Sequence, residues 1–263
     1  MSNNKSKRIR KLDPANTYIS KMISKKIIGI NALEYIQSYK YDNSYGDIIK
    51  LYEKLPHMYD SLIKNILLPQ NIKLLNRGIF GYNIDNLEAN FNESIAFLKL
   101  YNSEIEKFLK FKEDFEFNFL FGKYELCENI LDDSKKEISY SNWYLYHMFL
   151  VKEYKGGFDS NFSYLKEIIS SGAEHPIHGI FAFTFSRMVE KDLSIKNFQK
   201  YVEVEVYNFY NLKKDSKIRS FLKSYIEPFE IYFHENINDI FIGEEGCSII
   251  DRYINLRKFI TYK

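Results

Sequence analysis

The chain has 263 residues, of which 45% are hydrophobic and 27% are charged, and its formal net charge is +2. This length and composition favour one large domain or an elongated array with a sizeable core over two independent globules. The near-neutral charge argues against a protein devoted to a phosphate backbone, because that work needs a basic face.

The basic residues are concentrated at one end. Residues 1–11 contain five of them and no acid: Lys5, Lys7, Arg8, Arg10 and Lys11. Without these five, 32 basic residues face 35 acidic ones, so the rest of the chain carries a formal charge of −3. We expect residues 1–12 to be a disordered basic tail, which is either merely solvated or a contact for nucleic acid or an acidic partner.

The cysteine usage and the apolar segments bear on location. Cys127 and Cys247 are far apart in the sequence, which is typical of reduced thiols rather than of a disulfide framework. We find no run of about 18 uninterrupted apolar residues, the length that a membrane span requires. The sequence therefore predicts a cytoplasmic protein without a membrane association.

Helix-capping and helix-ending residues along the chain predict helices almost throughout. Asp13–Pro14 is a helix cap followed by proline in the first turn, and Asp85–Glu88 has the pattern of a capping box. Ser141 and Ser194 are candidate caps for later helices. We expect an all-α protein with a helical region over residues 13–83 that continues into stacked antiparallel helical hairpins over residues 84–263, as a short α-solenoid or a compact array.

Two stretches carry most of the information about hairpins. The aromatic run before Gly122 is followed by a second apolar pattern at helical spacing, so this glycine is expected to be a left-handed helix end. Gly156–Gly157 is expected to stop the helix that follows Ser141.

Tyr201–Tyr207 alternates with period two like a strand, but its flanks favour a helix, and both alternatives stay open.

Apolar positions recur every 34 residues in this region. The three series are Phe115, Phe149 and Phe183; Ile130, Tyr164 and Phe198; and Leu109, Trp143 and Ile177. Such a period arises because one hairpin cannot bury its apolar face alone, so hairpins stack and equivalent positions recur. We expect the first series to occupy equivalent buried positions.

Over residues 106–209 this pattern resembles the tetratricopeptide repeat, a helix–turn–helix unit of about 34 residues. Gly122 and Tyr124 match that family's turn, and Cys127 stands where the family prefers a small residue. The chain departs from the pattern because Asn161 and Ile195 occupy the positions equivalent to Cys127, and no proline closes each unit. The resemblance implies a groove that binds a peptide or a folded protein.

The helix after Ser141 is the predicted lining of that groove. Its Trp143, Tyr144, Tyr146 and His147 point in different directions around a helix, so some of them must leave the hairpin core. Tyrosine and tryptophan are effective interface anchors because they bury much area and keep a polar tip. The alternative is that all four simply pack between the hairpins.

No motif in the sequence indicates a particular chemistry. His175 and His178 form an H-x-x-H pair, but no third cysteine or histidine lies near them, so we predict no metal site and no cofactor. Walker loops, dinucleotide fingerprints and nucleophile elbows are missing, so an enzyme is the weaker class. We expect a non-catalytic protein-interaction module of an adaptor, chaperone, immunity or regulatory type. The alternatives are a nucleic-acid-associated protein that uses the basic tail and exposed aromatics, and a helical enzyme with an unfamiliar site.

Overall fold

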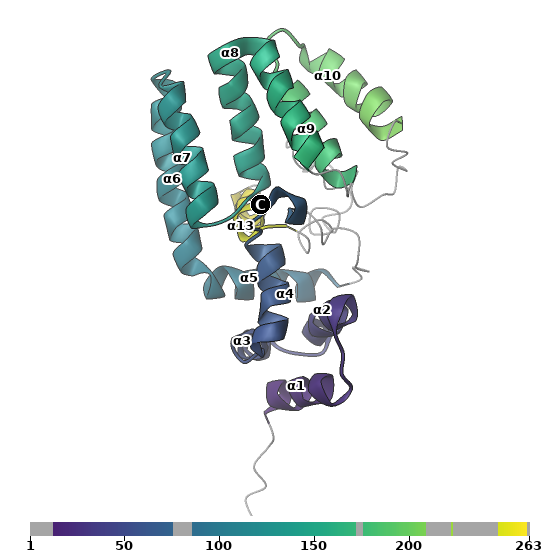
Figure 1. Ribbon diagram of the computed structural model, residues 1–263. Helices are drawn as coiled ribbons and strands as arrows, with labels where there is room; N and C mark the ends of the chain where they lie inside the picture. Colours follow the sequence, from purple (N-terminus) through teal and green to yellow (C-terminus); the bar gives the residue numbers. More distant parts are fainter. Residues whose placement is uncertain (1–12, 76–85, 172–175, 209–221, 223–246, 262–263) are drawn as a thin grey trace, which may run out of the picture.

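A computed structural model describes residues 13–75, 86–171, 176–208, 222 and 247–261 (Figure 1). Within these ranges the chain is helical apart from short turns, and none of the described residues lies in a β-strand. The predicted all-α class is confirmed. The same part of the chain holds no helix that is long and apolar enough to cross a membrane.

The N-terminal helices form the lower part of the molecule in Figure 1. They are α1 (Pro14–Ser24), α2 (Gly29–Ser38), η1 (Tyr39–Tyr41), α3 (Tyr45–Glu53), α4 (His57–Leu67) and η2 (Ile72–Leu74). Asp13 caps α1 as predicted, since its Oδ1 accepts a hydrogen bond from the Ala15 N–H at 3.0 Å. The helix α5 (Leu87–Leu100) follows, and its cap is Asn86 rather than the expected Asp85, which lies outside the described residues.

Three helical hairpins stand side by side above this layer (Figure 1). The first is α6 (Asn102–Leu120) with α7 (Tyr124–Glu137), the second is α8 (Asn142–Ser171) folded on itself, and the third is α9 (Pro176–Met188) with α10 (Ile195–Tyr201) and η4 (Val202–Tyr207). Ser141 and Ser194 are the expected caps, because their hydroxyls accept from the N–H groups of Tyr144 and Asn197.

The helix α8 turns back at Gly157, whose φ of 66° and ψ of −162° are not helical. The rings of Phe149 and Tyr164 lie 4.9 Å apart. A straight helix would separate these two positions by about 22 Å along its axis. The two arms of α8 are therefore an antiparallel hairpin, as the glycine pair predicts.

Positions that recur every 34 residues are not all equally buried. Phe115 and Phe149 are buried, whereas Phe183 is half-buried against the core. In the third series Trp143 is buried but Leu109 is exposed, and the Ile177 side chain lies outside the description. The structure thus has hairpins at the expected places, while the tetratricopeptide resemblance stays a prediction.

The alternating segment Tyr201–Tyr207 is helical. Val202–Tyr207 adopts a π-helical turn, which widens the helix by one residue and brings Val202, Val206 and Tyr207 into the core. The period of two in the sequence is also typical of a β-strand, which was the alternative to a helix for this segment. Val204, the middle valine of the alternating pattern, is exposed, so the period of two does not describe one buried face.

The last described helix, α13 (Ile249–Thr261), lies between α5 and the lower end of α8 in Figure 1 and contacts both. The Asp251 carboxylate on α13 accepts from the backbone N–H groups of Asn142 at 2.9 Å and Trp143 at 3.2 Å. It therefore caps the N-terminus of α8, where unpaired N–H groups and the helix dipole favour a negative charge.

Candidate functional site

The four residues predicted to line a groove do not form an open surface. Trp143 and Tyr144 are buried, and Tyr146 and His147 are half-buried. The side chains of Trp143 and His147 pack with Phe115 of α6, with ring centroids 5.7 Å and 4.9 Å from the Phe115 ring. This face of α8 is mainly an internal contact between the first two hairpins, so it offers little area to a partner.

His147 is held as a neutral packing residue. Its Nδ1 lies 2.8 Å from the Trp143 carbonyl oxygen, which can only accept, so Nδ1 carries the proton. Burial lowers the pKa of His147 to about 4. The imidazole is therefore uncharged at neutral pH and is surrounded by aromatic rings.

Tyr144 faces a cleft of about 370 Å³ between η2, α7 and α8, which Tyr140 and Tyr164 also line. Its hydroxyl donates to Asp132 Oδ1 at 3.3 Å and accepts from Lys135 Nζ at 3.2 Å. Burial raises the pKa of Tyr144. The phenol already has polar partners within the chain, so its contacts are those of a structural side chain.

Several of the large exposed apolar side chains lie instead at the ends of the hairpins. At the α6–α7 end Phe117, Leu120 and Phe121 are 56%, 85% and 65% exposed. Leu120 and Phe121 follow Phe117 by three and four residues, so both lie next to it on the surface of α6. The rings of Phe117 and Phe121 lie 4.8 Å apart, so these two side chains make one continuous apolar surface.

The local sequence explains why this surface is exposed. Gly122 has a φ of 68°, a backbone conformation that glycine adopts without strain. Its N–H donates to the Phe119 carbonyl at 3.0 Å, and the Lys123 N–H donates to the Asn118 carbonyl at 3.0 Å. This pair of bonds is a Schellman motif, which ends α6 at Leu120 with Phe121 as its C-cap, and the last turn of the helix projects into solvent.

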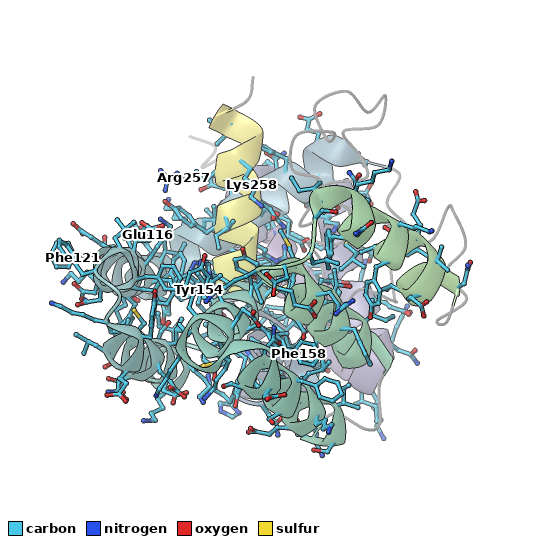
Figure 2. The ribbon with its side chains drawn as sticks, turned by 90° about the horizontal axis from the view of Figure 1, so that it is seen from above. Glu116, Phe121, Tyr154, Phe158, Arg257 and Lys258 are labelled. Atoms are coloured by element: carbon cyan, nitrogen blue, oxygen red, sulfur yellow. The ribbon has the colours of Figure 1, made fainter. Side chains whose placement is uncertain are left out.

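A second exposed aromatic group surrounds the turn of α8. Tyr154, Phe158 and Phe162 are all exposed, and the rings of Phe158 and Phe162 are stacked 5.6 Å apart. Figure 2 looks down on the hairpin ends and shows Phe121, Tyr154 and Phe158 coming from neighbouring ends. We call the six side chains the hairpin rim: Phe117, Leu120, Phe121, Tyr154, Phe158 and Phe162.

Lysines accompany the rim. The ammonium groups of Lys123, Lys191 and Lys166 lie 5.8, 4.3 and 4.4 Å from the ring centroids of Phe121, Tyr154 and Phe162, respectively. An ammonium group near an aromatic face is attracted by the ring quadrupole. Three of the rim's aromatic rings therefore each have a lysine ammonium group close by.

The aromatic run before Gly122 supplies half of the rim, but its pattern in the sequence does not predict that these side chains are exposed. The other candidates that the sequence predicts are not tested. Lys5, Lys7, Arg8, Arg10 and Lys11 lie outside the described residues, as does His175, and the His178 side chain is not described. Among the residues that are described, no group of three or more His, Cys, Asp or Glu side chains could hold a metal ion. Cys127 and Cys247 are both buried.

The fold and the rim define a class of protein, an all-α array of helical hairpins with exposed aromatic ends. Comparison of the chain with known protein families, with curated proteins and with solved structures finds no match.

Proposed function

We propose that this chain is a non-catalytic protein-interaction module that binds its partner through the hairpin rim. The observation that carries the proposal is the exposure of Phe117, Leu120 and Phe121 at the end of α6, with the two phenylalanine rings in contact. Single exposed apolar residues are common on protein surfaces, but contiguous groups of large ones mark interaction sites.

The geometry gives the proposal a physical basis. A helical array that ends in solvent normally presents a polar outer face. Here the projecting turn of α6 presents two phenylalanines and a leucine, whose burial against a partner would remove apolar area from water. Aromatic side chains are well suited to such contacts, because they bury much area at a small cost in conformational entropy.

The test is a comparative capture experiment from native lysate. The bait is the full chain, and the rim variant carries Leu120→Ser and Phe121→Ser. The matched control is Met58→Ser, which removes a side chain that is 55% exposed on α4, away from the rim. We expect a protein that is retained by the wild type and by the control to be lost from the rim variant, with all three circular dichroism spectra alike. Equal retention by all three would overturn the proposal.

A second candidate function, binding of single-stranded nucleic acid, is favoured by the lysines over the rim aromatics. Exposed rings can stack on bases while lysines contact the backbone. This function predicts affinity for an oligonucleotide that falls steeply with added salt and weakens when residues 1–11 are deleted. Binding of a protein by apolar contacts predicts a weak dependence on salt.

A further inference from the structure

The end of α1 and the loop that joins it to α2 lie in the lower part of the molecule in Figure 1, whereas the hairpin rim lies at its upper end. The exposed charged and apolar side chains of this segment are lysines and isoleucines: Lys21, Ile23, Lys25, Lys26 and Ile28. Ile23 and Ile28 are 54% and 65% exposed. We call these five side chains the basic turn.

Hydrogen bonds fix the backbone of the basic turn. The Lys26 N–H donates to the Ile23 carbonyl at 3.0 Å, and the Ile27 N–H donates to the Met22 carbonyl at 3.1 Å, which is a Schellman motif. The Tyr59 hydroxyl of α4 donates to the Ile27 carbonyl at 3.1 Å. The exposed side chains are therefore presented by a backbone that is tied to both α1 and α4.

Lys26 occupies the position of this motif that glycine usually takes. Its φ of 51° makes it the one described residue other than glycine with a positive φ. A residue with a Cβ is strained in this conformation, and Gly122 holds the equivalent position at the end of α6. A lysine thus stands here against the preference of the backbone, which points to a role for its side chain.

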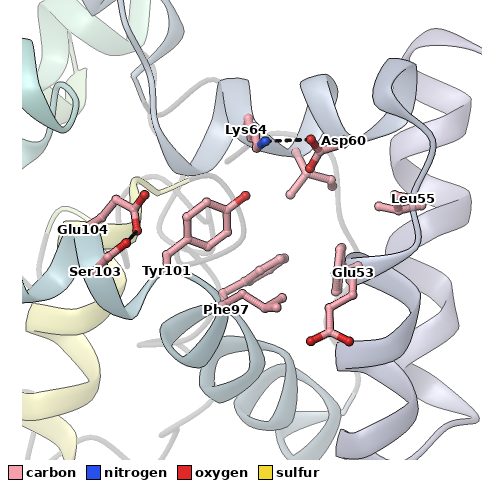
Figure 3. Close-up of a pocket in the computed structure, with 11 residues that line it drawn as sticks. Glu53, Leu55, Asp60, Lys64, Phe97, Tyr101, Ser103 and Glu104 are labelled. Atoms are coloured by element: carbon pink, nitrogen blue, oxygen red, sulfur yellow. Dashed lines mark hydrogen bonds and ion pairs between the residues drawn. The ribbon is translucent and has the colours of Figure 1, made fainter.

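The lysines of the basic turn are not neutralised within the described part of the fold. Elsewhere lysines pair with carboxylates, as Lys64 does with Asp60 at 2.8 Å (Figure 3). Among the described residues no carboxylate lies within ion-pair distance of Lys21, Lys25 or Lys26. The dipole of α1 favours a cation at this end, but it does not explain why apolar side chains are exposed beside the lysines.

The charge of the whole chain is polarised towards this end. Residues 1–33 hold eight basic residues and one acidic residue, while residues 34–263 hold 29 basic and 34 acidic ones. The formal charge is therefore +7 over the first segment and −5 over the second. A polyanionic surface attracts one part of such a chain and repels the other, so it orients the molecule as it binds.

We propose that the basic turn docks the protein on the surface of a membrane that contains anionic phospholipids. The lysine ammonium groups are complementary to the phosphate and carboxylate groups of such lipids. Ile23 and Ile28 are suited to the boundary between the headgroups and the acyl chains, where apolar side chains leave water. A nucleic acid offers the same phosphate charge but no apolar layer, so the exposed isoleucines favour the membrane.

Docking on a membrane surface differs from crossing the membrane. The expectation of no membrane association rests on the lack of an apolar run of spanning length, and surface docking needs no such run. Because the basic turn and the hairpin rim lie at different ends of the molecule (Figure 1), a docked protein leaves its rim free for a partner. The inference thus goes beyond the proposed function of the rim and does not depend on it.

The test is co-sedimentation of the full chain with vesicles of phosphatidylcholine alone or of equimolar phosphatidylcholine and phosphatidylserine. We expect binding to the anionic vesicles only, and less of it as salt is added. The lysine variant, Lys21→Gln/Lys25→Gln/Lys26→Gln, should bind on the order of 100-fold more weakly, since each lysine near an anionic surface contributes about fivefold in affinity. The isoleucine variant, Ile23→Ser/Ile28→Ser, should bind about tenfold more weakly, because it removes apolar area that the bilayer buries.

Each variant has a matched control elsewhere on the molecule. The control for the lysine variant makes the same change in net charge at exposed lysines of α5 and α6: Lys99→Gln/Lys107→Gln/Lys110→Gln. The control for the isoleucine variant is Ile195→Ser/Ile260→Ser, at side chains that are 78% and 60% exposed on α10 and α13. Both controls should bind the anionic vesicles as the wild type does.

A single substitution separates the side chain of Lys26 from its backbone. Lys26→Gly relieves the left-handed conformation, so it should raise the melting temperature by about 2–4 °C. The same variant should bind the anionic vesicles about fivefold more weakly, because it removes one charge from the basic turn. A variant that is more stable and binds as tightly as the wild type would overturn the role assigned to Lys26.

Three results would overturn the docking proposal itself. The first is a wild type that does not distinguish the two kinds of vesicle, and the second is a lysine control that loses as much binding as the lysine variant. The third is an isoleucine variant that binds as tightly as the wild type, because the attraction is then electrostatic alone. In that case, tighter binding of a duplex oligonucleotide than of the vesicles would identify a nucleic acid as the occupant.

Discussion

Lys40 Nζ lies 2.9 Å from Glu93 Oε2, and both side chains are only 1% exposed. The other carboxylate oxygen of Glu93 accepts a hydrogen bond from the Tyr52 hydroxyl at 2.7 Å. The Glu93 carboxylate on α5 thus joins Lys40 of η1 to Tyr52 of α3 in the interior of the N-terminal layer. Such a pair is costly to break, because both groups are buried away from water.

Neutralising one member of this pair should destabilise the fold more than neutralising both. We expect Glu93→Gln to lower the free energy of unfolding by about 3 kcal/mol or more, since the Lys40 ammonium then lacks the opposing carboxylate. The double variant Lys40→Met/Glu93→Gln removes both charges and keeps an acceptor for Tyr52, so it should recover most of the loss. Urea unfolding followed by circular dichroism measures both. A double variant that is no more stable than Glu93→Gln would refute this view of the pair.

The turn of α8 should depend on glycine at position 157. The φ of 66° and ψ of −162° lie in a region that is essentially restricted to glycine, and a Cβ there would meet no atom within 4 Å. Gly157→Ala should therefore destabilise the protein through backbone strain alone, by about 1–3 kcal/mol. The matched control is Gly46→Ala in α3, where the backbone is helical and the substitution should be neutral or stabilising. Equal thermal melting of the two variants would contradict the assigned turn.

His147 should make the protein less stable in mild acid. Burial holds its pKa at about 4 in the fold, against an ordinary value of 6.5. Between these values the unfolded chain binds a proton that the folded chain does not, so stability is lost as the pH falls from 6.5 to 4. Relative to wild type, His147→Phe should gain on the order of 2 kcal/mol in the free energy of unfolding across this range. A difference that does not change with pH would show that His147 does not titrate in this way.

Asp251 should have the opposite effect to His147 on how the stability of the fold changes with pH. Burial raises its pKa to about 6 from the ordinary 3.8, against the hydrogen bonds from Asn142, Ser248 and Trp143, which lower it. The folded chain then binds a proton that the unfolded chain does not, so this group adds stability as the pH falls from 6 to 4.

Asp251→Asn should be destabilised at pH 7, because an amide presents donors as well as an acceptor to the N–H groups of α8. It should also lose more stability than wild type between pH 6 and pH 4. Urea unfolding at both pH values measures the difference, and a variant that gains relative stability in acid would contradict the raised pKa.

Local signals in the sequence predicted the helices well. Caps at Asp13, Ser141 and Ser194 and the glycine turns at Gly122 and Gly157 are decided by groups within a few residues of one another, so their chemistry can be read from short segments. The capping role of Asp251 could not be predicted in this way, because its partners are more than 100 residues distant in the sequence.

The candidate site was harder to predict for a related reason. Trp143, Tyr144, Tyr146 and His147 cover several sides of a helix. Only the packing of α6 against α8 decides that the face with Trp143 and His147 is internal. Phe115 and Phe117 belong to the same aromatic run, yet one is buried and the other exposed. Periodicity places them on different faces of α6, but it does not show which face a neighbouring helix covers.

Hydrogen exchange of the chain, alone and with a captured partner, tests the proposed binding surface most directly. If the hairpin rim binds the partner, amide exchange should slow in residues 115–126 and 154–162 and stay unchanged in α1 and α2. Slowed exchange elsewhere, with unchanged exchange at both hairpin ends, would contradict the proposal that this protein binds through its rim.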